Sequence, residues 1–120
     1  MIKHHDACFG CGLVELDRSP EGVAGSFVVR SELQGPPGYA HGGIMATALD
    51  EAMSLLLQDR GIYALTTGLD VRLRAAAPVD AVVELAAWID REEGRRLYLA
   101  ARASGGETEF ATATGVFVRV

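Results

Sequence analysis

The 120-residue sequence has no long hydrophobic run, little cysteine and no excess of positive charge. It contains no stretch of about eighteen apolar residues, so we expect no membrane-spanning helix. The opening Met-Ile-Lys-His-His-Asp lacks the apolar core of a signal peptide, and we therefore expect a cytoplasmic protein. The formal net charge of −5 argues against a surface that binds nucleic acid or an anionic membrane.

The two cysteines form one Cys8-Phe9-Gly10-Cys11 motif, with His4 and His5 just before it. One pair cannot build a disulfide framework. Two cysteines and two histidines are ligand types of a tetrahedral zinc site, but adjacent histidines rarely bind the same ion and no second pair follows downstream. We therefore predict no metal and no cofactor. Residues 1–20 are interpreted as an N-terminal extension whose Cys-x-x-Cys turn packs against the domain edge.

Residues 39–58 form the one long helical pattern of the chain. A Gly/Pro-rich loop at 34–38 precedes it, and Gly61 stands where a helix stop belongs. An ordinary amphipathic helix would carry Lys or Arg on its solvent face, and none occurs between His41 and Asp59. Apolar residues cover well over half of the circumference, which indicates a largely buried helix, and leave a narrow polar stripe of Thr47, Asp50, Glu51, Ser54 and Gln58.

The rest of the chain reads as strands joined mostly by tight turns. Alternating or β-branched patterns predict strands over residues 22–30, 63–75, 79–90, 95–103 and 108–120. Hairpin connections imply an antiparallel sheet, and a helix that is apolar over most of its surface needs a sheet curved around it. We predict a single α+β domain over 1–120 with the hotdog fold, a curved antiparallel β-sheet wrapped around one long central α-helix. Free sheet edges favour pairing with a second copy.

The start of the helix carries two glycines, Gly42 and Gly43, which weaken it by roughly 1 kcal/mol each relative to Ala. They leave bare N–H groups at the positive end of the helix dipole, where a carbonyl oxygen or an anion can approach closely. Asp50 lies about 10 Å further along the axis from Gly43. One small reacting group cannot touch both within a subunit. If both serve one site, the sequence predicts a dimer with active sites at its interface.

The chain resembles a hotdog-fold acyl-CoA thioesterase of the phenylacetate-pathway-type (PaaI-like) branch. The resemblance covers nearly the whole chain and is most specific over residues 35–53, Gly-Pro-Pro-Gly-Tyr-Ala-His-Gly-Gly-Ile-Met-Ala-Thr-Ala-Leu-Asp-Glu-Ala-Met. The Cys-Phe-Gly-Cys-Gly run at 8–12 is also similar to such proteins. The resemblance implies hydrolysis of a small or medium acyl-CoA, aromatic or aliphatic, to free acid and CoA. It also implies a homodimer or a dimer of dimers.

The same resemblance implies catalytic roles. The Gly42 amide, with help from Gly43, would polarise the thioester carbonyl, and Asp50 of the partner subunit would act as general base or nucleophile. Glu51 competes with Asp50, but it lies 100° away around the helix, so only one of the two acids faces the site. Three positions match supporting residues: His41 bracing the loop and first helical turn, Gln34 holding the attacking water, and Ser54 orienting the water or the acid.

Substrate contacts are expected at the strand after the helix. Thr66, Thr67 and Gly68 open the strand that borders the site in relatives, with Gly68 where some of them have Ser. Arg72 and Arg74 share one strand face and are candidates for the CoA phosphates, although a solvated strand face explains them as well.

Three other functions stay open at this point. A non-catalytic hotdog module that binds acyl-CoA would need no acid at Asp50. A hydro-lyase of the same fold would use an Asp and a His together, and no His follows His41. A small zinc-binding or redox protein would be built on Cys8 and Cys11.

Overall fold

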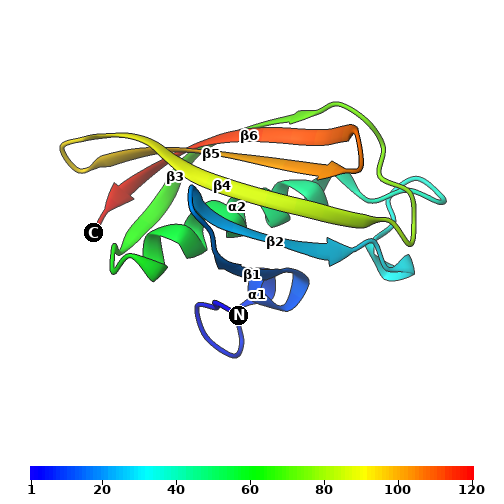
Figure 1. The fold of residues 1–120 in the computed structure, drawn as a ribbon, viewed down its shortest axis with the longest axis horizontal. Coiled ribbons are helices and arrows are strands. Elements are labelled where there is room, and N and C mark those ends of the chain that lie inside the picture. The colour runs from blue at the N-terminus through cyan, green and yellow to red at the C-terminus, as the bar shows by residue number, and fades with distance from the viewer.

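One long helix and a single curved sheet make up most of the computed structural model, which describes all of residues 1–120 (Figure 1). The elements follow the order α1 (Phe9–Leu13), β1 (Glu15–Arg18), β2 (Gly22–Val28), a short 3-10 helix (Ser31–Leu33), α2 (Gly42–Asp59), β3 (Ala64–Leu73), β4 (Val82–Glu93), β5 (Arg96–Gly105) and β6 (Thr108–Arg119).

The six strands form one antiparallel sheet in the order β1-β2-β4-β5-β6-β3. Strands β4, β5 and β6 are neighbours joined by tight turns, whereas β3 and β1 form the two edges. Figure 1 shows α2 lying along one face of this sheet. The predicted α+β hotdog fold is confirmed.

Two details of the predicted strands are corrected. The segment 1–20, predicted as an extension with a turn, contains α1 and β1, and β1 joins the sheet by pairing Leu16 with Gly25 of β2. This strand has four residues, of which only Leu16 is buried, so no alternating pattern marks it in the sequence. Residues 91–94, predicted as the loop between two strands, are only partly a loop: Arg91, Glu92 and Glu93 belong to β4, because their pairing with β5 continues past a bulge after Ile89.

The core lies between α2 and the sheet and contains 26 buried hydrophobic residues. On the helix, Leu49, Met53 and Leu56 are essentially inaccessible, and on the sheet so is Phe117. Gly115 of β6 lets the helix approach closely, because a Cβ there would lie 3.1 Å from the Met53 Cε atom. The middle and C-terminal half of α2 are thereby packed tightly against the sheet.

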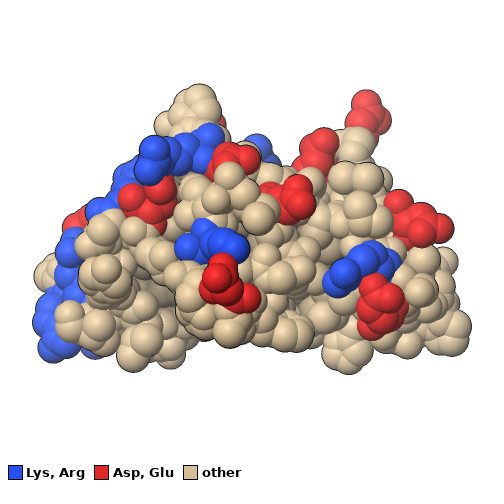
Figure 2. Space-filling model, turned by 90° about the horizontal axis from the view of Figure 1, so that it is seen from below, with Lys and Arg blue, Asp and Glu red and all other residues tan.

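Charged side chains are distributed unevenly over the surface. Figure 2 shows one face on which Asp and Glu are scattered between uncharged areas, while Lys and Arg gather mainly toward one end. No helix of the structure combines the length and the apolarity needed to cross a bilayer.

Candidate functional site

The first turn of α2 presents one backbone N–H group that has no partner within the protein. His41 is the N-cap, and its Nδ1 accepts a hydrogen bond of 2.8 Å from the Gly43 N–H. The His41 N–H itself donates to the Leu33 carbonyl at 2.8 Å, which ties the helix start to the preceding loop. The N–H groups of Ile44 and Met45 bond back to the His41 carbonyl. Gly42 alone in this turn keeps a free donor at the positive end of the helix dipole.

This helix start borders a largely apolar cavity of about 370 Å³. Its wall contains Gly42 and Met45 of α2 and Leu73 at the end of β3, with Arg74 beside them; the remaining lining residues are Pro36, Tyr39, Ala40, Ala75, Ala76 and Ala77. A larger cavity of about 480 Å³ lies on the outer face of β2, β4 and β5, away from the helix. The smaller cavity is therefore taken as the candidate site because it borders the free N–H group of Gly42, and not because of its volume.

Asp50 lies in the middle of α2, against the edge strand β3. Its Oδ1 atom accepts a hydrogen bond of 3.0 Å from the Thr66 hydroxyl. Burial raises the pKa of Asp50 above its usual range, the Thr66 hydrogen bond opposes this, the nearby Glu51 charge raises the pKa further and His4 lowers it. A carboxylate with a raised pKa is a better proton acceptor, as a general base requires.

The structure does not bring Asp50 and Gly42 together within one chain. The two residues are separated by roughly 12 Å along the helix axis. Thr66 contacts Asp50 because β3 has a bulge between Thr66 and Gly68, which turns the Thr66 side chain toward the helix. Thr66 was expected only to border the site, and its contact with the acid could not be read from the sequence.

The predicted supporting residues have partners of their own. Gln34 donates from Nε2 to the Ser31 carbonyl at 2.8 Å and accepts from the Gly38 N–H at 2.6 Å, so its amide holds the entry loop in shape. Ser54 lies one turn beyond Asp50, but its hydroxyl lies 2.9 Å from Nε2 of His4.

Among the predicted substrate contacts, Thr67, Arg72 and Arg74 are exposed and Gly68 is half-buried; Arg74 follows the last residue of β3. Thr67 donates from its hydroxyl to the Val116 carbonyl of β6 at 3.2 Å, and Gly68 pairs with the same residue after the bulge. Arg72 forms an ion pair with Asp70 at 2.9 Å, and Arg74 forms one with Glu109 at 3.2 Å. Both pairs lie in solvent, where ion pairs are weak. Each arginine can therefore release its carboxylate partner and bind another anion.

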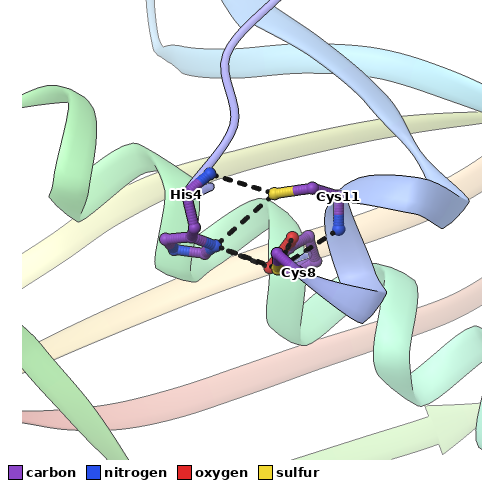
Figure 3. Close-up of side chains that lie close together, drawn as sticks. His4, Cys8 and Cys11 are labelled. Atoms are coloured by element: carbon purple, nitrogen blue, oxygen red, sulfur yellow. Dashed lines mark hydrogen bonds and ion pairs between the residues drawn. The ribbon is translucent and has the colours of Figure 1, made fainter. Parts of the chain in front are cut away.

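Glu51, the acid next to Asp50, points about 100° away around the helix and is buried against the N-terminal segment. Its carboxylate lies 3.2 Å from Nδ1 of His4 and 3.3 Å from the Cys8 sulfur. Figure 3 shows His4, Cys8 and Cys11 converging on this point from the N-terminal segment and α1. Burial, followed by hydrogen bonding to Glu51, raises the pKa of the Cys11 thiol to about 12. His5 takes no part, and its Nδ1 instead accepts the Ala7 N–H.

Comparisons with known proteins agree with this architecture. A family model described as "Thioesterase superfamily" matches residues 37–110. Acyl-coenzyme A thioesterase THEM5 of Homo sapiens is 35% identical over 94 residues, which cover 75% of this chain and 37% of that protein. The chain thus spans a little over a third of the length of this curated relative.

Two crystal structures illustrate the likeness in fold. A hypothetical thioesterase protein with coenzyme A from Streptococcus pneumoniae TIGR4 superposes with a TM-score of 0.83 at 18% identity, over 91% of this chain and 87% of that one. A phenylacetic acid degradation-related protein from Ralstonia eutropha JMP134 superposes with a TM-score of 0.79 at 18% identity, over 89% and 84%.

Proposed function

We propose that this chain, which belongs to the thioesterase superfamily, hydrolyses small or medium acyl-CoA, aromatic or aliphatic, to free acid and CoA. The observation that carries the proposal is the free N–H of Gly42 at the start of α2, beside an apolar cavity. The relative THEM5 is named an acyl-coenzyme A thioesterase, and the structural neighbour from S. pneumoniae is named with coenzyme A. Both names support this substrate class.

Carbonyl polarisation is assigned to Gly42 rather than shared with Gly43. The Gly43 N–H is already donated to His41, so it cannot donate to a substrate without breaking the cap. A thioester carbonyl at the helix start would accept the Gly42 hydrogen bond and be stabilised further by the helix dipole as its oxygen gains charge. One such donor is typically worth about 10²–10³ in rate.

The acid is assigned to Asp50 of the partner subunit. Strand β3 is a free edge of the sheet and exposes Leu65, Leu69 and Leu73, whose exposed fractions are 63%, 41% and 59%. An exposed apolar edge favours pairing with a second copy. Antiparallel pairing of β3 with itself about its centre brings the Thr66 end of one strand beside the Leu73 end of the other. Asp50 contacts the first end and Gly42 the second, so pairing brings Asp50 toward the partner's Gly42.

The proposed reaction uses Asp50 as a general base. Asp50 takes a proton from water, the water oxygen bonds to the carbonyl carbon, and the Gly42 amide stabilises the resulting oxyanion. The carbon–sulfur bond then breaks, and the departing thiolate takes up a proton to give CoA.

The acyl group occupies the apolar cavity beside Gly42. The CoA phosphates lie beyond the pantetheine arm, outside this cavity, and Arg72 and Arg74, both in solvent-exposed ion pairs, are proposed to meet them. We propose that the reaction takes place in the cytoplasm.

A panel of acyl-CoA thioesters with free-thiol detection tests the proposal. We expect turnover by the wild type and a loss of at least about 10² in kcat for Asp50→Ala and Asp50→Asn. Tight binding of acyl-CoA without turnover by the folded wild type would instead identify a binding module. Unimpaired Asp50 variants would remove this residue from the mechanism, and Glu51→Gln would be tested next.

Hybrid dimers test the shared site. A variant blocked at Gly42 and the Asp50→Asn variant are each inactive alone, but a hybrid of the two contains one intact site. Random re-association should therefore restore about a quarter of the wild-type activity, because half of the dimers are hybrids and half of their sites are intact. Verified hybrids without activity would place the whole site within one chain.

A further inference from the structure

Four side chains from separate parts of the chain meet on the side of α2 that carries Glu51, about 100° around the helix from Asp50. His4 precedes α1, Cys8 caps α1, Cys11 lies within it, and Glu51 comes from α2. Their ligand atoms all lie within 4.8 Å of one another. We propose that His4, Cys8, Cys11 and Glu51 bind a zinc ion, which fastens the N-terminal segment to α2. This inference does not depend on the proposed hydrolase activity.

Four of the six separations between these ligand groups lie close to the edges of a zinc tetrahedron. Zinc bonds of about 2.3 Å to sulfur and about 2.0–2.2 Å to nitrogen and oxygen, at tetrahedral angles, separate neighbouring ligand atoms by about 3.4–3.8 Å. Nδ1 of His4 lies 3.5 Å from the Cys8 sulfur, 3.7 Å from the Cys11 sulfur and 3.2 Å from the carboxylate of Glu51. The Cys8 sulfur lies 3.3 Å from Oε2 of Glu51, whereas His4 contacts Oε1 of the same carboxylate. The remaining separations lie within 4.8 Å, so the side chains would close in by up to about 1 Å around a bound ion.

The surrounding hydrogen bonds suit metal-binding forms of these side chains. The Cys11 sulfur receives the His4 N–H at 3.0 Å, and the Cys8 sulfur receives the Cys11 N–H at 3.4 Å, and both contacts stabilise thiolates. Nε2 of His4 lies 2.9 Å from the Ser54 hydroxyl. Donation of the ring N–H to this hydroxyl leaves the Nδ1 lone pair facing the cluster, the usual arrangement of a metal-bound histidine.

The burial of Glu51 also favours a cation at this position. Its side chain is 7% exposed, and no Lys or Arg lies within ion-pair distance of it. A buried carboxylate needs a compensating charge, and His4 is the only basic side chain in contact with it. Gly10 lets the carboxylate reach this position, because a Cβ at residue 10 would lie 2.6 Å from the Glu51 Cδ atom.

The chemistry of the donors selects zinc and a structural role. Two thiolates, an imidazole and a carboxylate suit a borderline-soft ion rather than Mg²⁺ or Ca²⁺. All four positions of the tetrahedron are filled by protein atoms, as in structural zinc sites, and none is left for a reacting water. The sequence argued against a metal because it offered only the neighbouring His5 as a fourth ligand. The fold supplies Glu51 instead, from far along the chain.

Metal content measured by mass spectrometry tests the inference directly. The full chain is expressed and purified with reductant and without chelator, then exposed to zinc and passed through gel filtration. We expect about one zinc per chain in the wild type. Cys11→Ser and Glu51→Gln should retain less than about a tenth of the wild-type zinc. His5→Ala is the matched control, because this neighbouring histidine lies outside the cluster, and it should retain the full amount.

Cobalt substitution of the wild type keeps the test decisive if the cluster variants do not fold. Co²⁺ added to the metal-free protein should give the thiolate-to-metal charge-transfer band and the strong visible bands of a tetrahedral site, and zinc should abolish them. A folded wild type that holds no stoichiometric zinc and gives no such bands would overturn the inference. So would equal zinc in the wild type and in folded Cys11→Ser. Neither readout involves acyl-CoA, so failure here is distinguishable from failure of the hydrolase proposal.

Discussion

Replacing Gly42 by proline removes the one N–H group on which the proposed mechanism depends, with little change elsewhere. Gly42 is the first residue of α2, and its N–H has no partner in the protein. Proline is well tolerated at this helical position, because its fixed φ suits the helix and no hydrogen bond is lost. His41 has φ −65° and ψ 135°, an extended conformation that the residue before proline prefers.

The structural cost of this substitution is small, whereas the catalytic cost is large. A Cβ at residue 42 would lie 2.9 Å from Cδ1 of Leu73, whose exposed side chain can rotate away. Proline also reduces the conformational freedom of the unfolded chain, and this stabilisation offsets part of the cost of the close contact with Leu73. We therefore expect the free energy of unfolding to change by about 1 kcal/mol or less. Loss of one oxyanion donor should lower kcat by about 10²–10³, which corresponds to about 2.7–4 kcal/mol of transition-state stabilisation.

Gly42→Ala is the matched control, because it adds the same Cβ but keeps the N–H. Both variants are assayed by thiol release on the best acyl-CoA substrate, and circular dichroism and thermal melting establish that they are folded. We expect Gly42→Ala to keep most of its kcat while Gly42→Pro loses it. If the two folded variants are equally active, the amide is not used and the assignment of the helix start as the oxyanion site is refuted.

Three further predictions concern the acid and the dimer. Thr66→Val removes the donor that lowers the pKa of Asp50, so the acidic limb of the kcat/KM pH profile should move to higher pH; an unmoved limb contradicts the role of Asp50 as base. Burial raises the pKa of Asp50 in the folded protein above its value in the unfolded chain. Asp50 therefore adds to the free energy of unfolding at low pH, and this contribution is lost as the pH rises through the folded-state pKa. Asp50→Asn should therefore melt no lower than wild type at neutral pH, even though it is inactive, and a clearly lower Tm would contradict this. Leu69→Arg on the free edge of β3 should shift gel-filtration elution to the monomer and abolish activity together, and an active monomer would exclude the shared site.

The main features of the fold follow from strong local patterns. Helix α2 was predicted over 39–58 and lies at Gly42–Asp59, because a continuous run of helix formers between a Gly/Pro loop and Gly61 leaves little alternative. The start shifted by three residues because His41 acts as the N-cap, with an extended backbone. The long strands were predictable for the same reason, since alternation over about ten residues is hard to mistake.

Features that depend on contacts between distant residues were not predictable. Strand β1 is defined by its pairing with β2, not by its own four residues. The Thr66 contact with Asp50 arises from a bulge in β3 that no local residue pattern marks. The identity of the free donor also needed coordinates, because only they show the His41 ring accepting the Gly43 N–H and leaving Gly42 unpaired.

The two adjacent acids of α2 have different proposed roles, base and zinc ligand, because they point in different directions. Asp50 faces the edge strand, where the partner subunit is proposed to bind, and Glu51 faces the N-terminal segment. Any rotation of α2 about its axis that moved Asp50 away from Thr66 would also pull the Glu51 carboxylate out of contacts of 3.2 and 3.3 Å with His4 and Cys8. Zinc at this cluster would resist such a rotation far more strongly than hydrogen bonds alone. The N-terminal segment, which takes no direct part in the chemistry, would thereby fix the direction in which the proposed base points.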